Sequence, residues 1–149
     1  MGLFSGLRGR GADTTLDVST AVMVPMVAGM LADGSIDEAE VRQIRSICVW
    51  SPIYASNSTE RDTEIILRAI RLVEDQGPEA MCGKARETLS PALRETAFVF
   101  AIRLLFSDGH VGHKEQQTAE KLVRWLGLSD DRARMLVEAV SIMQHTADA

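Results

Sequence analysis

The sequence predicts an all-α protein, a compact bundle of about seven helices with an internally duplicated helix–turn–helix unit. Three observations support this prediction. The chain has 149 residues and is 46% hydrophobic, which provides enough apolar side chains for the core of one domain. Residues that favour helices are plentiful, whereas β-branched and aromatic residues form no alternating runs of the kind that strands show. Signals that start and stop helices recur along the chain from Asp17 onward.

The first three predicted helices are bounded by Gly, Pro and capping residues. The first is an apolar segment that we expect to bend near Pro25. Ser35 and Glu38 form a capping-box pattern that starts the second, which ends near Trp50 because a Pro follows two residues later. A Ser-Asn-Ser-Thr stretch starts the third, which stops at Gly77. These segments cover 16–32, 36–50 and 59–76.

The last four helices have equally clear boundaries. Gly77 is followed by a Pro that starts a short fourth helix, and Ser90 caps the fifth with a Pro at its first position. The sixth closes at Gly127, and Ser129 caps the seventh. These segments cover 78–89, 91–106, 112–126 and 130–143. The sequence therefore predicts one helical domain over 16–145, preceded by a flexible tail over 1–15.

Two segments, ADGSIDEAE at 32–40 and SDGHVGHKE at 107–115, align without gaps at an offset of 75 positions. They share the pattern D-G-x-[I/V]-x-x-x-E, and each stands between an apolar helix and an amphipathic one. Because hydrophobic, turn and acidic positions all match together, the pattern indicates a duplicated helix–turn–helix unit. Two such hairpins would pack around a pseudo-twofold axis.

The shared pattern resembles the second half of a calcium loop, but an EF-hand is excluded. The side-chain ligands four and two residues before each Asp would be Gly29 and Leu31, and in the second copy Leu104 and Phe106. A simpler interpretation is that each Asp-Gly only shapes a turn. Against it, each copy keeps an acid in the first turn of the next helix. If the hairpins are neighbours, four carboxylates converge, which favours binding of a hard divalent cation.

At MLADGSIDEAEV and LLFSDGHVGHKEQ the sequence resembles the TerB-like family, the tellurite resistance B proteins, over most of the chain. The resemblance implies a helical bundle with a duplicated core and an acidic surface that binds divalent metal. It also implies a bacterial stress or chemical-resistance role near the inner face of the membrane, and related domains occur in co-chaperones. The metal ligands that the resemblance implies by matching position are Asp33, Glu40, Asp108 and Glu115. To these we add Asp37 and His113 as auxiliary ligands.

The second copy departs from the first, because Asp37 and Glu38 become Gly112 and His113. The second segment is therefore less acidic and richer in nitrogen. A zinc site made of Asp108, His110, His113 and Glu115 is chemically reasonable, but an all-oxygen site for Ca²⁺ or Mg²⁺ is favoured over Zn²⁺.

No sequence signal of an enzyme is present. The chain has no nucleophile elbow, P-loop or dinucleotide fingerprint. We expect its two cysteines, Cys48 and Cys82, to be buried thiols and not a disulfide or a metal site. A metal-dependent hydrolase is the weakest of the functions considered.

The formal net charge of −5 argues against a general nucleic-acid-binding protein. The apolar run over 18–32 is too short to span a bilayer, and no secretory signal is convincing, so we expect a cytoplasmic location. Leu3, Phe4 and Leu7 beside two arginines suggest peripheral contact with the inner membrane. The predicted function is a non-enzymatic stress-response domain that binds a divalent cation and contacts protein partners. The alternative is a metal-independent interaction or co-chaperone-type module.

Overall fold

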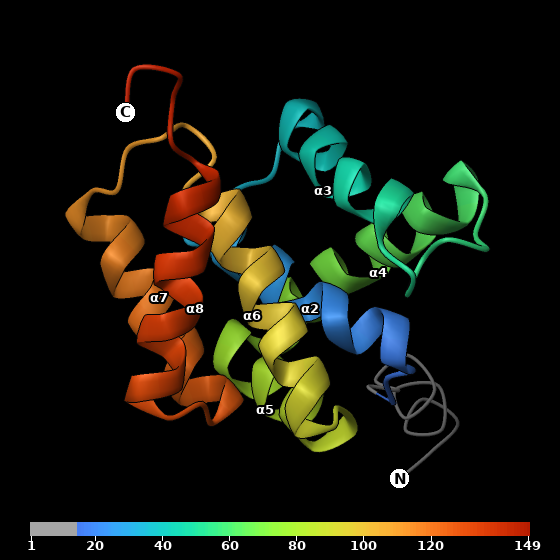
Figure 1. Cartoon of the computed structure of the whole chain (residues 1–149). Coiled ribbons are helices and arrows are strands. Elements are labelled where there is room, and N and C mark those ends of the chain that lie inside the picture. The colour runs from blue at the N-terminus through green and yellow to red at the C-terminus, as the bar shows by residue number, and fades with distance from the viewer. Residues whose placement is uncertain (1–14) are drawn as a thin grey trace, which may run out of the picture.

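The computed structural model describes residues 15–149, in which the regular secondary structure consists of seven α-helices and no strand (Figure 1). The all-α prediction is confirmed. The predicted tail over 1–15 lies outside the described residues except for Thr15. The helices are α2 (Val18–Leu31), α3 (Glu38–Trp50), α4 (Thr59–Gln76), α5 (Pro78–Thr88), α6 (Pro91–Leu105), α7 (His113–Leu126) and α8 (Asp130–Met143).

Most helix boundaries fall where the sequence places them, because local capping groups define them. The hydroxyls of Ser58, Ser90 and Ser129 each accept a hydrogen bond from the backbone N–H three residues later. α7 ends at Gly127, whose φ of 69° lies in the left-handed region that favours glycine.

The prediction that Ser35 caps the second helix is wrong. The N-cap of α3 is Asp37, whose Oδ1 accepts a hydrogen bond of 2.8 Å from the backbone N–H of Glu40. The residue before this cap, Ile36, and the one four positions after it, Val41, both pack against the core. Such a hydrophobic pair across the start of a helix fixes the entry angle of the chain, and this explains why α3 begins at Glu38.

α2 lies at the centre of the bundle and packs against α4, α5, α6 and α7 (Figure 1). Every residue from Thr20 to Met30 is buried. Pro25 lies inside this helix and provides no backbone N–H to the helical ladder. Near the end of α2, Gly29 packs against Leu105 of α6, with a Cβ position 3.6 Å from the Leu105 side chain. The helix that carries the first Asp-Gly turn is thus held firmly against the helix that carries the second.

α3 and α8 lie on opposite sides of α6 (Figure 1). α3 packs against α4 and α6, whereas α8 packs chiefly against α6. α3 contributes buried Ile44, Ile47 and Cys48 to the core, while α8 contributes only Ala133 and Val140. α8 is therefore the least covered helix of the bundle.

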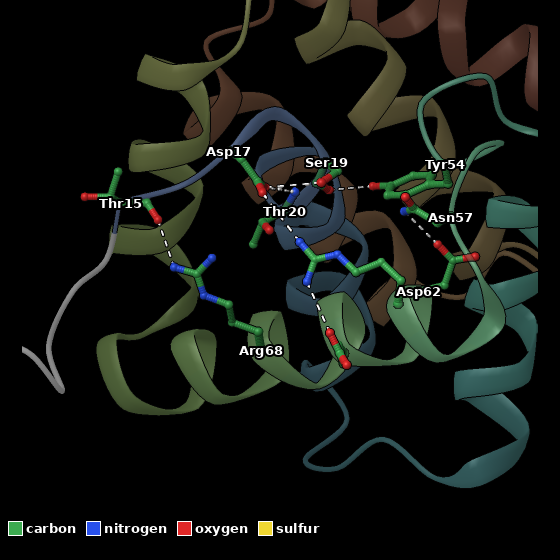
Figure 2. Close-up of polar contacts among 10 residues, drawn as sticks. Thr15, Asp17, Ser19, Thr20, Tyr54, Asn57, Asp62 and Arg68 are labelled. Atoms are coloured by element: carbon green, nitrogen blue, oxygen red, sulfur yellow. Dashed lines mark hydrogen bonds and ion pairs between the residues drawn. The ribbon is translucent and has the colours of Figure 1, made fainter.

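A group of polar contacts ties the start of α2 to α4 and to the segment before α4 (Figure 2). Asp17 caps α2 by accepting from the backbone N–H of Thr20 at 2.8 Å. The hydroxyl of buried Tyr54 donates to the backbone oxygen of Ser19 at 2.7 Å. Arg68 of α4 donates to the backbone oxygen of Thr15 at 2.9 Å. These bonds anchor the central helix at the end far from the Asp-Gly turns.

The two Asp-Gly turns have the same hydrogen bond at the same position. The N–H of Gly34 donates to the oxygen of Leu31 at 2.9 Å, and that of Gly109 donates to the oxygen of Phe106 at 3.0 Å. These residues, like the first residues of α3 and α7, are 75 positions apart. The origin of this similarity in a duplication stays a prediction.

Among the described helices, none combines the length and the hydropathy that crossing a membrane requires.

Candidate metal centre

The first loop joins α2 to α3 and carries three of the predicted ligands. Asp33 is exposed on the turn, and Gly34 follows it with a φ of 109°, a conformation that side-chain-bearing residues rarely adopt. Asp37 caps α3, so one of its oxygens already accepts a backbone hydrogen bond. Glu40 lies in the first turn of α3, where the sequence analysis places it, beside Asp37 and Asp33.

The Glu40 carboxylate has an oxygen that is unsatisfied within the part of the chain that the structure describes. Its Oε2 is buried and has no hydrogen-bond partner. Burial raises the pKa of Glu40, and the negative charges of Asp37 and Asp33 raise it further, while a backbone hydrogen bond at Asp37 acts in the opposite direction. Ionised Glu40 therefore carries a desolvation and repulsion cost, which a bound cation would offset.

The second loop has a different local structure. Asp108 accepts a hydrogen bond of 2.9 Å from the backbone N–H of His110, which is an Asx-turn geometry. The N-cap of α7 is Gly112, which has no capping side chain. The Glu115 carboxylate folds back into the space that a side chain there would fill, since a Cβ on Gly112 would lie 2.6 Å from Glu115 Oε2. His113 is exposed at the first position of α7.

An ion pair joins the two loops. Lys114 Nζ, on the first turn of α7, lies 3.3 Å from Asp33 Oδ1. Both side chains border a small open cavity of about 150 Å³, together with Glu115 and Lys121. The cavity between the loops is therefore lined by two acids and two lysines, and not by acids alone.

The predicted ligands are brought together only in part. Asp33, Asp37 and Glu40 form one acidic group in the first loop, and Asp33 shares the inter-loop cavity with Glu115. Within residues 15–149 no three His, Cys, Asp or Glu side chains are arranged so that they could hold a metal ion. The four carboxylates thus form no single cluster in this conformation. Metal binding by Asp33, Glu40, Asp108 and Glu115, with Asp37 and His113, stays a prediction.

Sequence reasoning did not identify Lys114 or Lys121 as part of this region. In the repeat alignment the position of Lys114 corresponds to Ala39 in the first copy, so the shared pattern contains no signal for it. Its partner Asp33 is 81 residues away. Only the packing of α7 beside the end of α2 reveals this contact.

The cysteines are buried free thiols, as predicted. Burial raises the pKa of Cys82 to about 12. Burial also raises the pKa of Cys48 to about 12, with an additional contribution from the negative charge of Asp62. Both raised pKa values keep the thiols protonated near neutral pH, so neither has the thiolate character that a nucleophile needs.

The family model described as "Tellurite resistance protein TerB" matches residues 19–138. The chain belongs to the TerB family. The matched region begins in α2 and ends in α8, so it contains both Asp-Gly loops, and the resemblance recognised at those loops is confirmed. A search of curated proteins and a search of solved structures gave no match.

Proposed function

We propose that this TerB-family protein is a non-enzymatic stress-response domain of the tellurite-resistance type that binds a divalent cation at its first Asp-Gly loop. The observation that supports this most directly is the Glu40 carboxylate, with a buried oxygen that lacks a hydrogen bond and two acidic neighbours. Ionising such a group costs free energy, and a bound cation offsets that cost by coordinating the carboxylate.

In this proposal the first loop is the main site. Asp33, Asp37 and Glu40 supply only oxygen ligands, which favours Ca²⁺ or Mg²⁺ over Zn²⁺. The second loop offers Asp108 and Glu115 with a histidine nearby, and we assign it a weaker and less selective role. When bound, the cation would neutralise the acidic group and bring the loop carboxylates closer together.

The output of binding would be a change in a protein–protein contact. The loops lie on the surface of the bundle, where a change of charge alters the attraction of charged partners. We place this activity in the cytoplasm, with peripheral contact to the inner face of the membrane. Neither nucleic acid nor a substrate to be turned over is part of the proposal.

One observation favours a second candidate, a metal-independent interaction module. Asp33 is already neutralised by Lys114, and the cavity beside it contains two lysines. In this alternative the acids shape the turns and present a negative surface to a basic partner. Partner binding would then be insensitive to chelator and weakened by salt.

The experiment that separates the two is a titration of chelator-stripped protein with Ca²⁺, Mg²⁺, Mn²⁺ and Zn²⁺, followed by amide NMR. Two matched variants serve as controls: Asp33→Ala alters only the first loop, and Asp108→Ala alters only the second. The proposal predicts saturable shifts over residues 33–40, lost in Asp33→Ala and retained in Asp108→Ala. Absence of shifts at millimolar metal, which corresponds to about 4 kcal/mol of binding free energy, would support the metal-independent module.

A further inference from the structure

A cavity of about 200 Å³ lies where α3 meets the end of α6 and the end of α8. We call it the α3–α6 cavity. It is lined by Gln43 and Ser46 of α3, Arg103 of α6, Ser107 just after α6, and Gln144 just after α8. Among the described residues no carboxylate lines it, although the whole chain has 21 acidic residues against 16 basic ones. The one charged side chain in its lining is therefore positive.

The α3–α6 cavity has the same place in the second half of the chain as the inter-loop cavity has in the first. Four of its lining residues align, at the offset of 75 positions, with residues that line the inter-loop cavity: Gln43 with Thr118, Ser46 with Lys121, Leu104 with Gly29, and Ser107 with Ala32. The acids that line the inter-loop cavity, Asp33 and Glu115, have Asp108 and Glu40 as their counterparts, and neither counterpart lines the α3–α6 cavity. The two cavities are therefore alike in position and different in charge.

Arg103 is held in position without an acidic partner. Its guanidinium lies 5.3 Å from the centroid of the Trp50 ring, a cation–π contact, and that ring packs edge-on against Phe100 with centroids 5.5 Å apart. Within residues 15–149, no carboxylate oxygen lies within 4.0 Å of Arg103. A guanidinium has five N–H donors in a planar fork that matches the oxygens of a phosphate. The cavity is thus lined by a partly buried, oriented cation whose charge is not neutralised by a neighbouring acid.

Neutral side chains of the lining add hydrogen-bond donors to this cation. The hydroxyl of Ser107 and the side-chain amides of Gln43 and Gln144 can each donate to a ligand oxygen. Ser46 is the exception, because its hydroxyl already donates to the backbone oxygen of Gln43 at 2.6 Å. Around Arg103 the cavity therefore offers three neutral donor groups.

The ends of α6 and α8 act against an anion, since the last carbonyls of a helix carry about half an elementary negative charge. These carbonyls are partly compensated. The oxygen of Leu104 accepts from the backbone N–H groups of Phe106 and Ser107, and that of Ile142 accepts from Gln144 and His145. The full charge of Arg103 and the neutral donors favour an anion over this opposition, and we expect a weak affinity, with a Kd of about 1 mM.

We propose that the α3–α6 cavity binds a small free oxyanion of the size of inorganic phosphate. Arg103 supplies the charge and a pair of N–H donors, and Ser107, Gln43 and Gln144 supply the neutral donors. The volume of about 200 Å³ lies below the roughly 300–1,000 Å³ of sites for drug-sized ligands, so the cavity suits an ion with a few waters and not a nucleotide. This site is separate from the first Asp-Gly loop and does not depend on a cation there.

The test is a titration of the chelator-stripped full chain with inorganic phosphate at neutral pH, followed by NMR of backbone and side-chain amides. Phosphate is added up to about 20 mM, roughly twenty times the expected Kd. We expect saturable shifts at Gln43, Arg103, Ser107 and Gln144. Sodium chloride at the same ionic strength should not reproduce them, which separates binding from screening. Glycerol 3-phosphate, which carries the same group on an organic body, should bind more weakly than the free ion.

Three variants, each checked for folding by circular dichroism, test the role of Arg103. Arg103→Gln removes the charge and should weaken phosphate binding about tenfold. Arg103→Lys keeps a cation beside Trp50 but loses the planar fork, so we expect a loss of about threefold. Arg42→Gln is the matched control, because it removes the same charge from α3 next to Gln43 without lining the cavity. The Kd of this control should stay within about twofold of the native value.

Four results would overturn the proposal. The first is a native chain without saturable shifts over the whole phosphate range. The second is a folded Arg103→Gln variant that binds phosphate with the native Kd. The third is an Arg42→Gln control that loses as much affinity as Arg103→Gln, since this would reflect net charge and not a site. The fourth is tighter binding of glycerol 3-phosphate than of phosphate, which would assign the cavity to a phosphate monoester in place of a free ion.

Discussion

Glu40→Gln perturbs the first loop in a way that has opposite consequences with and without cation. The substitution removes a charge and keeps the shape of the side chain. In the native chain, burial and then the charges of Asp37 and Asp33 raise the pKa of Glu40 above its ordinary value of 4.5. The folded state therefore binds this proton more tightly than the unfolded state, and stability falls as the pH rises from 4.5 through the raised pKa. Above that interval, without cation, the variant should be more stable than the native chain.

The magnitude follows from the surroundings of the group. Glu40 is partly exposed and its two acidic neighbours are exposed, so solvent screens the repulsion among the three carboxylates. Removing this repulsion should raise the free energy of unfolding by about 0.5 kcal/mol. A cation at about a hundred times its Kd stabilises the native chain by about 2.7 kcal/mol, or roughly 5–10 °C in Tm for a domain of this size. The variant, with one charged ligand fewer, should gain less than half of this.

The assay is thermal unfolding followed by circular dichroism, in chelator and in Ca²⁺ or Mg²⁺. Glu38→Gln is the matched control, since it removes the same charge from the same turn at an exposed position. We expect Glu40→Gln to be more stable than the native chain in chelator and less stable than it in metal. The order of stability of Glu38→Gln and the native chain should be the same in both conditions. An equal metal-induced shift in all three proteins would refute the assignment of Glu40. A Glu40→Gln variant less stable than the native chain in chelator would refute the repulsion.

Three further predictions concern other contacts. Lys114→Gln removes the ammonium group that competes with a metal ion for Asp33. The metal affinity measured by calorimetric titration should therefore increase about two- to fivefold. Lys121→Gln, at the other lysine that lines the cavity, should leave the metal affinity unchanged. Tyr54→Phe removes the 2.7 Å hydrogen bond to the backbone oxygen of Ser19. The free energy of unfolding should fall by about 1 kcal/mol, and the Tm measured by calorimetry should fall by roughly 2–4 °C. Burial raises the pKa of Asp17, but its capping and side-chain hydrogen bonds and a nearby arginine lower this pKa overall. Asp17→Ala should therefore lower the free energy of unfolding by about 1 kcal/mol at neutral pH, measured by urea unfolding. That difference should shrink as the pH falls below 3.8 and the native carboxylate is protonated; a constant difference would contradict this reasoning.

The helices could be predicted from sequence because their limits are local. Ser58, Ser90 and Ser129 cap helices through bonds that span three residues. The start of α3 could not be predicted in the same way. Ser35 and Asp37 are both good N-caps, and each is followed three residues later by a Glu. Burial of the residue after Ser35 against the core decides between them, and that is a tertiary contact.

The candidate site was predictable to a smaller extent. The repeat pattern locates both loops, but it treats them as equivalent, whereas the structure gives them different caps. The pattern also does not show that an oxygen of Glu40 is buried and lacks a hydrogen-bond partner. It also cannot show that Lys114 reaches Asp33, because the two residues meet only through the packing of helices distant in sequence.

The position of α2 at the centre of the bundle has a consequence for biosynthesis. Its apolar residues are covered by α4, α5 and α6, which follow it in the chain and end only at Leu105. At about 5–20 residues per second, a ribosome needs several seconds to deliver that cover. During this interval a largely apolar nascent helix has no partner, which makes it a binding segment for chaperones at the ribosome. We expect ribosome-bound chains stalled before α6 to be captured by such factors, and chains stalled well beyond α8 to be released.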